Sequence, residues 1–291
     1  MTLVTAPIAA TQYIEYLDES PTTVTPLGGR SWNSRAQNLT LVYSELADGD
    51  ELAHVGEFEY VVLVTDDSSS VTVSATPNTV SLTGRGVIVV PPGESRVIAS
   101  GPAKIVRLFD GRELTVVTAA LNAGAYTQAD ARVAPVEPWP EPVGGRQLRV
   151  YPLADYAPEA GRFGNIFRTS TFMINFFDPH DGPRDAEQLS PHHHDDFEQC
   201  SLAVGGDWVH HIRTPWGPKR SQWRADEHRF VGSPSVAIIP PPVVHTSEAI
   251  GLGVNSLIDI FSPPRVDFSL KPGWVLNAAD YPAPADLGAD S

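Results

Sequence analysis

Short apolar runs, rich in valine and bounded by glycine, proline or polar residues, recur along the whole chain. The clearest of these runs are residues 60–65, 70–75, 87–90, 105–109, 171–177, 236–239 and 255–261. Runs of this length with β-branched side chains and turn residues at both ends are typical of β-strands. No stretch keeps a helical period, and the most helix-like piece, residues 113–122, is short and rich in threonine and valine. The pattern predicts an all-β protein.

The two halves of the chain repeat one pattern. In the first half GEFEYVVLVTDDSSSVTVSA precedes VIVVPPGESR, and in the second half DDFEQCSLAVGGDWVHHI precedes VAIIPPPVVH. Each half has a strand entered by Phe-Glu, a turn, another strand, and a four-residue apolar run ending in Pro-Pro. A polar insertion at residues 214–229 accounts for the longer spacing in the second half. Two copies of one β unit explain this repeat.

A proline-rich segment separates the two copies. Residues 133–146, VAPVEPWPEPVGGR, contain four prolines and two glycines and are typical of an extended linker. We therefore expect an N-terminal domain at residues 1–135 and a C-terminal domain at residues 136–291. A long loop within a single domain is the alternative.

Composition limits the partners and the compartment. The 291 residues include 20 basic and 35 acidic side chains, which gives a net charge of −15. Such a surface repels phosphate backbones and anionic lipid headgroups, and no basic run offsets it, so neither nucleic acid nor a membrane is an expected partner. The only cysteine is Cys200, and the first 14 residues lack the charge pattern of a secretory signal. Both features favour a cytoplasmic protein.

A histidine-rich segment in the second half has the spacing of a metal site. Side chains alternate faces along a strand, so His192, His194 and Glu198 share one face if the segment is extended. His245, which closes the run IIPPPVVH, is the natural fourth ligand from a neighbouring strand. Three imidazoles and one carboxylate suit one divalent transition metal such as Fe, Mn, Ni or Zn, whereas Ca²⁺ and Mg²⁺ prefer oxygen ligands. A surface cluster of histidines is the alternative.

The same residues resemble the motifs of the cupin superfamily. The first cupin motif is His-x-His, three or four residues, Glu, six residues and Gly, and here it matches His192, His194, Glu198 and Gly205. The second motif, a proline-led turn followed by a histidine, matches PPPVVH ending at His245. The resemblance implies two tandem jelly-roll β-barrels, of which the C-terminal one holds the metal.

The repeat also predicts that the N-terminal barrel is degenerate. If Glu59 is aligned with Glu198, Ala53 and Val55 replace the two histidines of the first motif, and Arg96 replaces His245. We therefore expect the N-terminal domain to lack the metal ligands and to have a structural role.

Three further residues are candidates for contact with substrate. Cys200 shares the parity of Glu198 and should point into the barrel, either as a core side chain or beside the metal. Of His210 and His211, one should face inward, and His211 is kept as the candidate. Arg213 begins a basic, tryptophan-containing insertion that either receives an anionic substrate or is a solvated hairpin.

The resemblance implies a metal-dependent enzyme that acts on a small, anionic organic acid. Within that class we expect dioxygenase chemistry, with a homodimer as the oligomeric state. Two alternatives stay open: a sugar isomerase or epimerase-like cupin, and a binding protein that uses the pocket only for recognition. The sequence does not decide whether the protein is an enzyme.

Overall fold

The computed structural model describes residues 6–137, 139–157, 159 and 161–287, and it consists mainly of antiparallel strands and loops. The two α-helices within these residues are single turns, Leu114–Val117 (α1) and Val266–Ser269 (α2). Five short 3-10 segments complete the helical content: Tyr16–Asp18, Ala123–Tyr126, Leu153–Asp155, Ala186–Gln188 and Arg220–Gln222. The prediction of an all-β protein is confirmed.

The N-terminal half forms two sheets that pack face to face. The larger sheet has the order β12-β9-β6-β11-β4-β3-β2, and the smaller sheet has the order β5-β10-β7-β8. The strands are β2 (Thr23–Val24), β3 (Arg30–Arg35), β4 (Leu39–Leu46), β5 (Glu51–Gly56), β6 (Tyr60–Val64), β7 (Ser70–Ala75), β8 (Asn78–Thr83), β9 (Gly86–Val90), β10 (Gly93–Ala99), β11 (Ala103–Asp110) and β12 (Arg149–Pro152).

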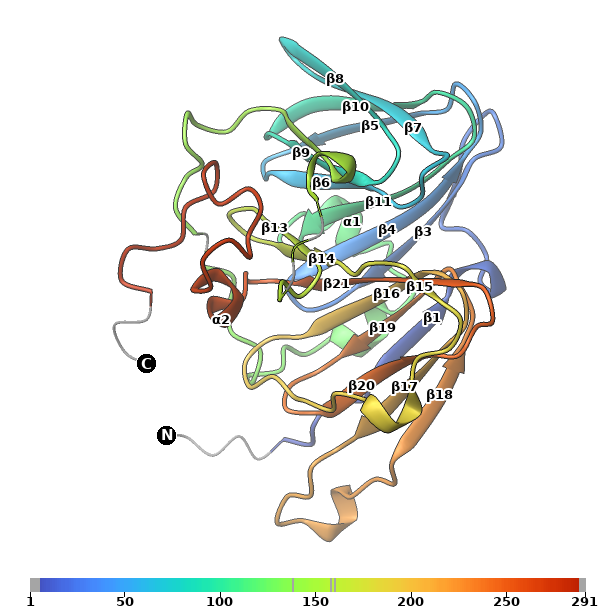
Figure 1. The fold of residues 1–291 in the computed structure, drawn as a ribbon, viewed down its shortest axis with the longest axis vertical. Helices are drawn as coiled ribbons and strands as arrows, with labels where there is room; N and C mark the ends of the chain where they lie inside the picture. The colour runs from blue at the N-terminus through green and yellow to red at the C-terminus, as the bar shows by residue number, and fades with distance from the viewer. Residues whose placement is uncertain (1–5, 138, 158, 160, 288–291) are drawn as a thin grey trace.

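The C-terminal half repeats this plan. Its larger sheet has the order β1-β19-β16-β21-β14-β13, with β15 paired to β21, and its smaller sheet has the order β18-β17-β20. The strands are β1 (Gln12–Glu15), β13 (Asn165–Arg168), β14 (Met173–Phe176), β15 (His180–Asp181), β16 (Gln199–Gly205), β17 (Trp208–Arg213), β18 (Glu227–Val231), β19 (Ser235–Ile239), β20 (Val244–Ala249) and β21 (Val254–Phe261). The two larger sheets lie in the middle of the molecule, and the smaller sheets lie at its two ends (Figure 1).

The halves exchange strands, which a boundary at residue 135 does not anticipate. The N-terminal strand β1 pairs with β19 of the C-terminal sheet, and β12, which follows the proline-rich segment, pairs with β9 of the N-terminal sheet. Each half therefore completes the larger sheet of the other. Both exchanged strands have only four residues, so neither carries a long pattern that could assign it to a sheet.

Three apolar regions hold the layers together. Strand β6 shows how they are divided, because Val61 and Leu63 enter a core between the two larger sheets while Val62 and Val64 enter the N-terminal barrel. The N-terminal barrel is filled by one continuous apolar cluster. The C-terminal barrel instead has three smaller clusters. This division leaves room in the C-terminal barrel for polar side chains and a cavity.

Within the part of the chain that the structure describes, no helix is both long enough and apolar enough to cross a bilayer.

Candidate metal centre

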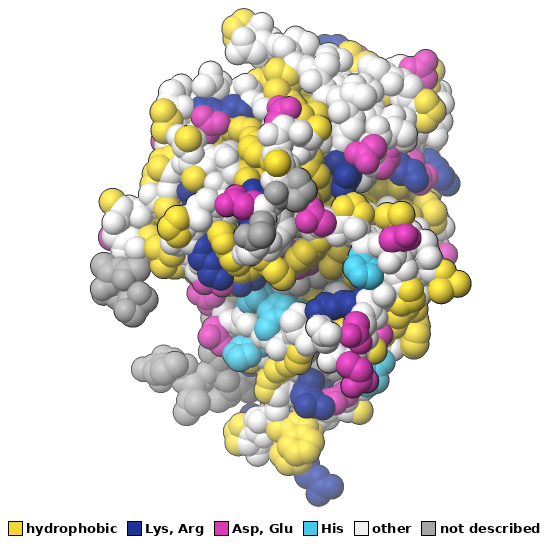
Figure 2. Space-filling model, viewed as in Figure 1, with side chains coloured by type: hydrophobic (Ala, Val, Ile, Leu, Met, Phe, Trp, Pro, Cys, Tyr) yellow, Lys and Arg dark blue, Asp and Glu magenta, His cyan; other side chains and the backbone are white. Residues whose placement is uncertain are grey.

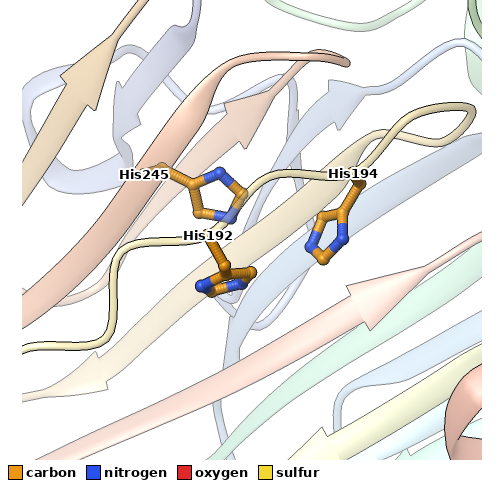
Figure 3. Close-up of side chains that lie close together, drawn as sticks. All are labelled: His192, His194 and His245. Carbon is orange, nitrogen blue, oxygen red and sulfur yellow. The ribbon is translucent and has the colours of Figure 1, made fainter.

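Three histidines meet at the mouth of the C-terminal barrel. His192 and His194 lie on the loop that precedes β16, and His245 lies on β20. One ring nitrogen from each residue lies within 4.8 Å of the others. Reciprocal backbone hydrogen bonds between His192 and His245, at 3.0 and 2.8 Å, fasten the loop to the strand. Figure 3 shows the three rings around a common space. The three imidazoles fit a single divalent metal ion.

The hydrogen bonds of the rings prepare nitrogen atoms for a metal. Nδ1 of His192 lies 2.9 Å from the carbonyl oxygen of Ser190, and Nδ1 of His245 lies 2.9 Å from that of Val243. A carbonyl can only accept, so both Nδ1 atoms carry the proton, and Nε2 is the ring nitrogen of each that is left to act as a ligand. Burial lowers the pKa of His194 to about 3 and that of His245 to about 4. Both rings are therefore neutral at physiological pH, as ligation requires.

The fourth polar group at this centre is Gln199, whereas the predicted ligand Glu198 lies outside the cluster in this structure. The Gln199 amide oxygen lies 2.8 Å from Nε2 of His194 and 3.2 Å from Nε2 of His245. Glu198 is outside the cluster, because its carboxylate accepts hydrogen bonds from the Gln37 backbone N–H at 2.5 Å and the Tyr126 hydroxyl at 2.9 Å. Residues 195–198 form a bend and a coil, so alternation from His194 cannot be counted across them.

The same shift moves Cys200 out of the barrel. Strand β16 directs Gln199, Ser201 and Ala203 inward, whereas Cys200 and Leu202 join the core between the two larger sheets. The thiol of Cys200 is completely buried there, and burial raises its pKa well above the ordinary value. Cys200 is therefore a core side chain in this structure, which is the first of the two positions that the sequence left open for it.

A cavity of about 590 Å³ opens beside the histidines. His192, Gln199 and His245 line one side of it, and aromatic residues, among them Trp208 and Trp274, line much of the rest. In Figure 2 histidine side chains gather in a hollow on this face, with basic side chains close by. A mainly apolar cavity with a few polar groups beside a metal centre is typical of a small-molecule site.

The cavity wall carries more positive than negative charge, in contrast to the acidic chain. Arg184, Arg265 and Lys271 line it, against the carboxylates of Asp178 and Asp259. Arg265 forms a two-bond ion pair with Asp267 and stacks 3.6 Å from the centre of the Phe268 ring.

Two of these cations are not neutralised by an acid. Among the described residues no carboxylate lies within 4.0 Å of the charged nitrogens of Arg184 or Lys271. Arg184 donates only to the backbone carbonyls of Ser247 and Gln188 and to the Ser190 hydroxyl. These charges favour an anionic ligand.

Comparison with known proteins supports the fold. No family model matches the chain, and no curated protein matches it by sequence. Among solved structures it is similar to the oxalate decarboxylase of Lactobacillus farciminis in a formate complex, with 12% identity over 91% of this chain and 88% of that one and a TM-score of 0.58. A mutant of the Bacillus subtilis oxalate decarboxylase gives 13% identity, 98% and 86% coverage and a TM-score of 0.58.

A third similar structure is AerE from Microcystis aeruginosa, with 11% identity over 89% of this chain and 99% of that one and a TM-score of 0.54. The chain has a bicupin fold. The expected architecture of two tandem cupin barrels is confirmed. At these identities the likeness concerns the fold alone.

The two other substrate candidates lie outside the cavity. Arg213 is exposed and forms an ion pair with Asp226, with Nη2 2.6 Å from the carboxylate. The ring of His211 contacts His228 and the carboxylate of Glu248 on the outer face of the small sheet. Its neighbour His210 is the inward residue, with Nδ1 2.9 Å from the Ser247 hydroxyl. One histidine of the pair faces inward, as parity predicted, and in this structure it is His210, whereas the candidate His211 faces outward.

The two glutamates aligned by the sequence repeat make equivalent contacts in the two halves. Glu198 of the C-terminal half accepts from Tyr126, which lies in the trailing segment of the N-terminal half. Glu59 of the N-terminal half accepts from Tyr281 at 3.0 Å, and Tyr281 lies in the trailing segment of the C-terminal half. Both carboxylates are buried. The repeated Phe-Glu thus marks a pair of contacts that link the halves, which explains why Glu198 points away from the histidines.

In the N-terminal barrel the residues aligned with the metal ligands serve the sheet. Arg96 of β10 faces Ala53 of β5 and forms an ion pair with Glu51 at 2.9 Å. The barrel interior behind them is filled by the apolar cluster that includes Val97. The structural role of this half stays a prediction.

Several cavity residues escaped the sequence analysis. Asn175 and Asp259 are buried polar residues that interrupt apolar stretches of the strands MINF and VNSLIDIF, and that interruption is a signal that could have found them. Burial raises the pKa of Asp259 to about 6. Arg265 and Lys271 flank the single-turn helix α2 after the last strand, where no periodic pattern places a side chain.

Proposed function

We propose that this protein is a metal-dependent enzyme that decarboxylates a small organic acid. The observation that carries the proposal is the group of three histidines, His192, His194 and His245, at the edge of a cavity with surplus positive charge. A divalent metal held by these imidazoles supplies a Lewis acid for a bound carboxylate or carbonyl. The two oxalate decarboxylases of similar fold support this reaction class by analogy.

The neutral amide at Gln199 is the reason to favour this chemistry over the dioxygenase chemistry expected from the sequence. A carboxylate at that position would offset one of the two positive charges of the ion. Gln199 carries no charge, so a divalent ion held by the histidines would keep both charges and would attract an anionic substrate more strongly. The sequence predicted that the negative charge of Glu198 would offset part of the charge of the metal. In the structure its carboxylate instead accepts hydrogen bonds from Gln37 and Tyr126.

The cavity supplies the other groups that the reaction requires. Arg184, Arg265 and Lys271 bind and orient an acid through its negative charge. In decarboxylation the bond to the departing carboxylate breaks, its electron pair stays on the remaining carbon, and that carbon takes one proton as CO₂ leaves. Asp259 is the buried carboxyl group in the cavity wall, and we assign it the transfer of this proton.

The test is turnover with defined metals. Protein loaded separately with Mn²⁺, Fe²⁺, Ni²⁺ or Zn²⁺ is incubated with a panel of small carboxylic acids, and CO₂ release and O₂ consumption are recorded together. We expect metal-dependent CO₂ release without net O₂ uptake, and none from the His194→Ala variant. Stoichiometric O₂ uptake would instead identify a dioxygenase. Sugar isomerisation without CO₂, or tight binding of an acid without turnover, would also contradict the proposal.

A further inference from the structure

A stripe of polar side chains runs across three strands of the C-terminal barrel, beside the cavity. Strand pairing places Asn175 of β14 opposite Asp259 of β21, and Asp259 opposite Ser201 of β16. All three are buried, and the Ser201 hydroxyl donates to Asp259 at 2.7 Å. The stripe continues to the metal centre, because the Gln199 amide donates to Ser201 at 2.9 Å.

The far end of this stripe is unsatisfied. Asn175 is 1% exposed, lines the cavity, and has no hydrogen-bond partner within the described residues for either its amide oxygen or its amide nitrogen. Buried polar groups nearly always have partners, so an amide that lacks both calls for an explanation. The backbone of Gly164 packs against the amide oxygen so closely that a Cβ there would lie 2.3 Å from it. The cavity is the space from which a partner can come.

We propose that Asn175 is a specificity-determining residue that binds a hydroxyl group of the substrate. A hydroxyl both donates and accepts, so it can satisfy both atoms of the amide. A second carboxylate suits this end less well, because it only accepts and would face Asp259.

Ser201 is the member of the stripe on β16, and it follows Gln199 by two residues. Along a strand this spacing separates the two Cα atoms by about 7 Å. The hydroxyl is therefore several bonds away from the carboxylate at the metal. The substrate class is a hydroxy acid with a chain longer than that of oxalate. This inference rests on the proposed function, in which the acid group of the ligand lies at the metal centre.

The experiment uses Mn²⁺-loaded protein and ω-hydroxy acids from glycolate to 5-hydroxypentanoate, each compared with the acid that lacks the hydroxyl, and glutarate as the dicarboxylate. Binding is followed by the fluorescence of Trp208 and Trp274, which line the cavity. We expect one of the longer hydroxy acids to bind at least tenfold more tightly than its unsubstituted counterpart and than glutarate. The Asn175→Ala and Asn175→Asp variants should lose that gain, whereas Asn78→Ala, on an exposed strand, should keep it.

A purely structural role for Asn175 predicts different results. If the amide only supports the fold, the near-isosteric Asn175→Leu variant should lower the melting temperature of the metal-free protein and leave the hydroxyl preference intact. Our inference predicts an unchanged or higher melting temperature and a lost preference. Equal binding of hydroxy and unsubstituted acids by the wild type would overturn the inference while leaving the proposed function standing. If no acid of the panel binds, the proposed function fails together with it.

Discussion

The neighbouring residues Glu198 and Gln199 should respond to substitution in opposite ways. Glu198 is 7% exposed and accepts two hydrogen bonds, from the Gln37 backbone N–H and from the Tyr126 hydroxyl. A Glu198→Gln substitution keeps the size of the side chain but replaces one acceptor oxygen with an NH₂ group. One of the two buried donors then loses its partner, which costs about 1–3 kcal/mol. The free energy of unfolding should fall by that amount.

The matched change is Gln199→Leu, which removes the amide oxygen that approaches Nε2 of His194 and His245. The affinity of the Gln199→Leu variant for Mn²⁺ should fall at least tenfold, which corresponds to about 1.4 kcal/mol of binding free energy. The affinity of Glu198→Gln should stay within threefold of the wild type, because its carboxylate does not face the histidines.

Urea denaturation of the metal-free proteins measures the first effect, and Mn²⁺ titration by calorimetry measures the second. The result that would refute this reasoning is a Glu198→Gln protein that keeps its metal-free stability but loses Mn²⁺ binding. In that case Glu198 would be a ligand, and its contacts with Gln37 and Tyr126 would not hold in the metal-bound protein.

Three further predictions concern protonation, substrate charge and the core. The pKa values of His194 and His245, lowered by burial to about 3 and 4, lie below the ordinary 6.5. At these two positions the unfolded chain therefore binds more protons between pH 6.5 and 4, so the two rings add stability as the pH rises there. The change in urea midpoint of the metal-free protein from pH 5 to pH 7.5 should be less favourable to the higher pH in a His194→Asn variant than in the wild type, and an equal change would contradict this. Arg184→Gln should weaken binding of a carboxylic acid at least fivefold with little change in melting temperature, and unchanged affinity would remove Arg184 from the site. Cys200→Ser puts a hydroxyl in an apolar core and should cost about 1–3 kcal/mol in urea unfolding without metal loss, whereas loss of metal would show that the thiol acts at the centre.

Much of the fold could be predicted because strands display their burial directly in the sequence. The alternation in SVTVSA of β7 and the fully buried YVVLV of β6 follow from one-sided and two-sided packing. The exchange of β1 and β12 could not be predicted, because the four-residue strands QYIE and RVYP fit either sheet. Pairing of such short strands is decided by the position of the connecting chain.

The candidate site was only partly predictable for a related reason. His192, His194 and His245 come together because the loop before β16 is hydrogen-bonded to the start of β20. The alternation rule failed at Glu198, since β16 begins only at Gln199, and every inward residue of that strand is shifted by one. Arg265 follows the last strand without a repeating pattern, so only the folded chain shows that it lines the cavity.

The central claim is that His192, His194 and His245 hold one metal ion at the mouth of the C-terminal barrel. The most direct measurement is anomalous diffraction at the manganese edge from a crystal grown with Mn²⁺. The account predicts one strong peak within coordination distance of all three imidazoles, with the Gln199 side chain next to it and Glu198 still bound to Tyr126. A crystal with no peak between these histidines, or with its peak at another site, would contradict the account.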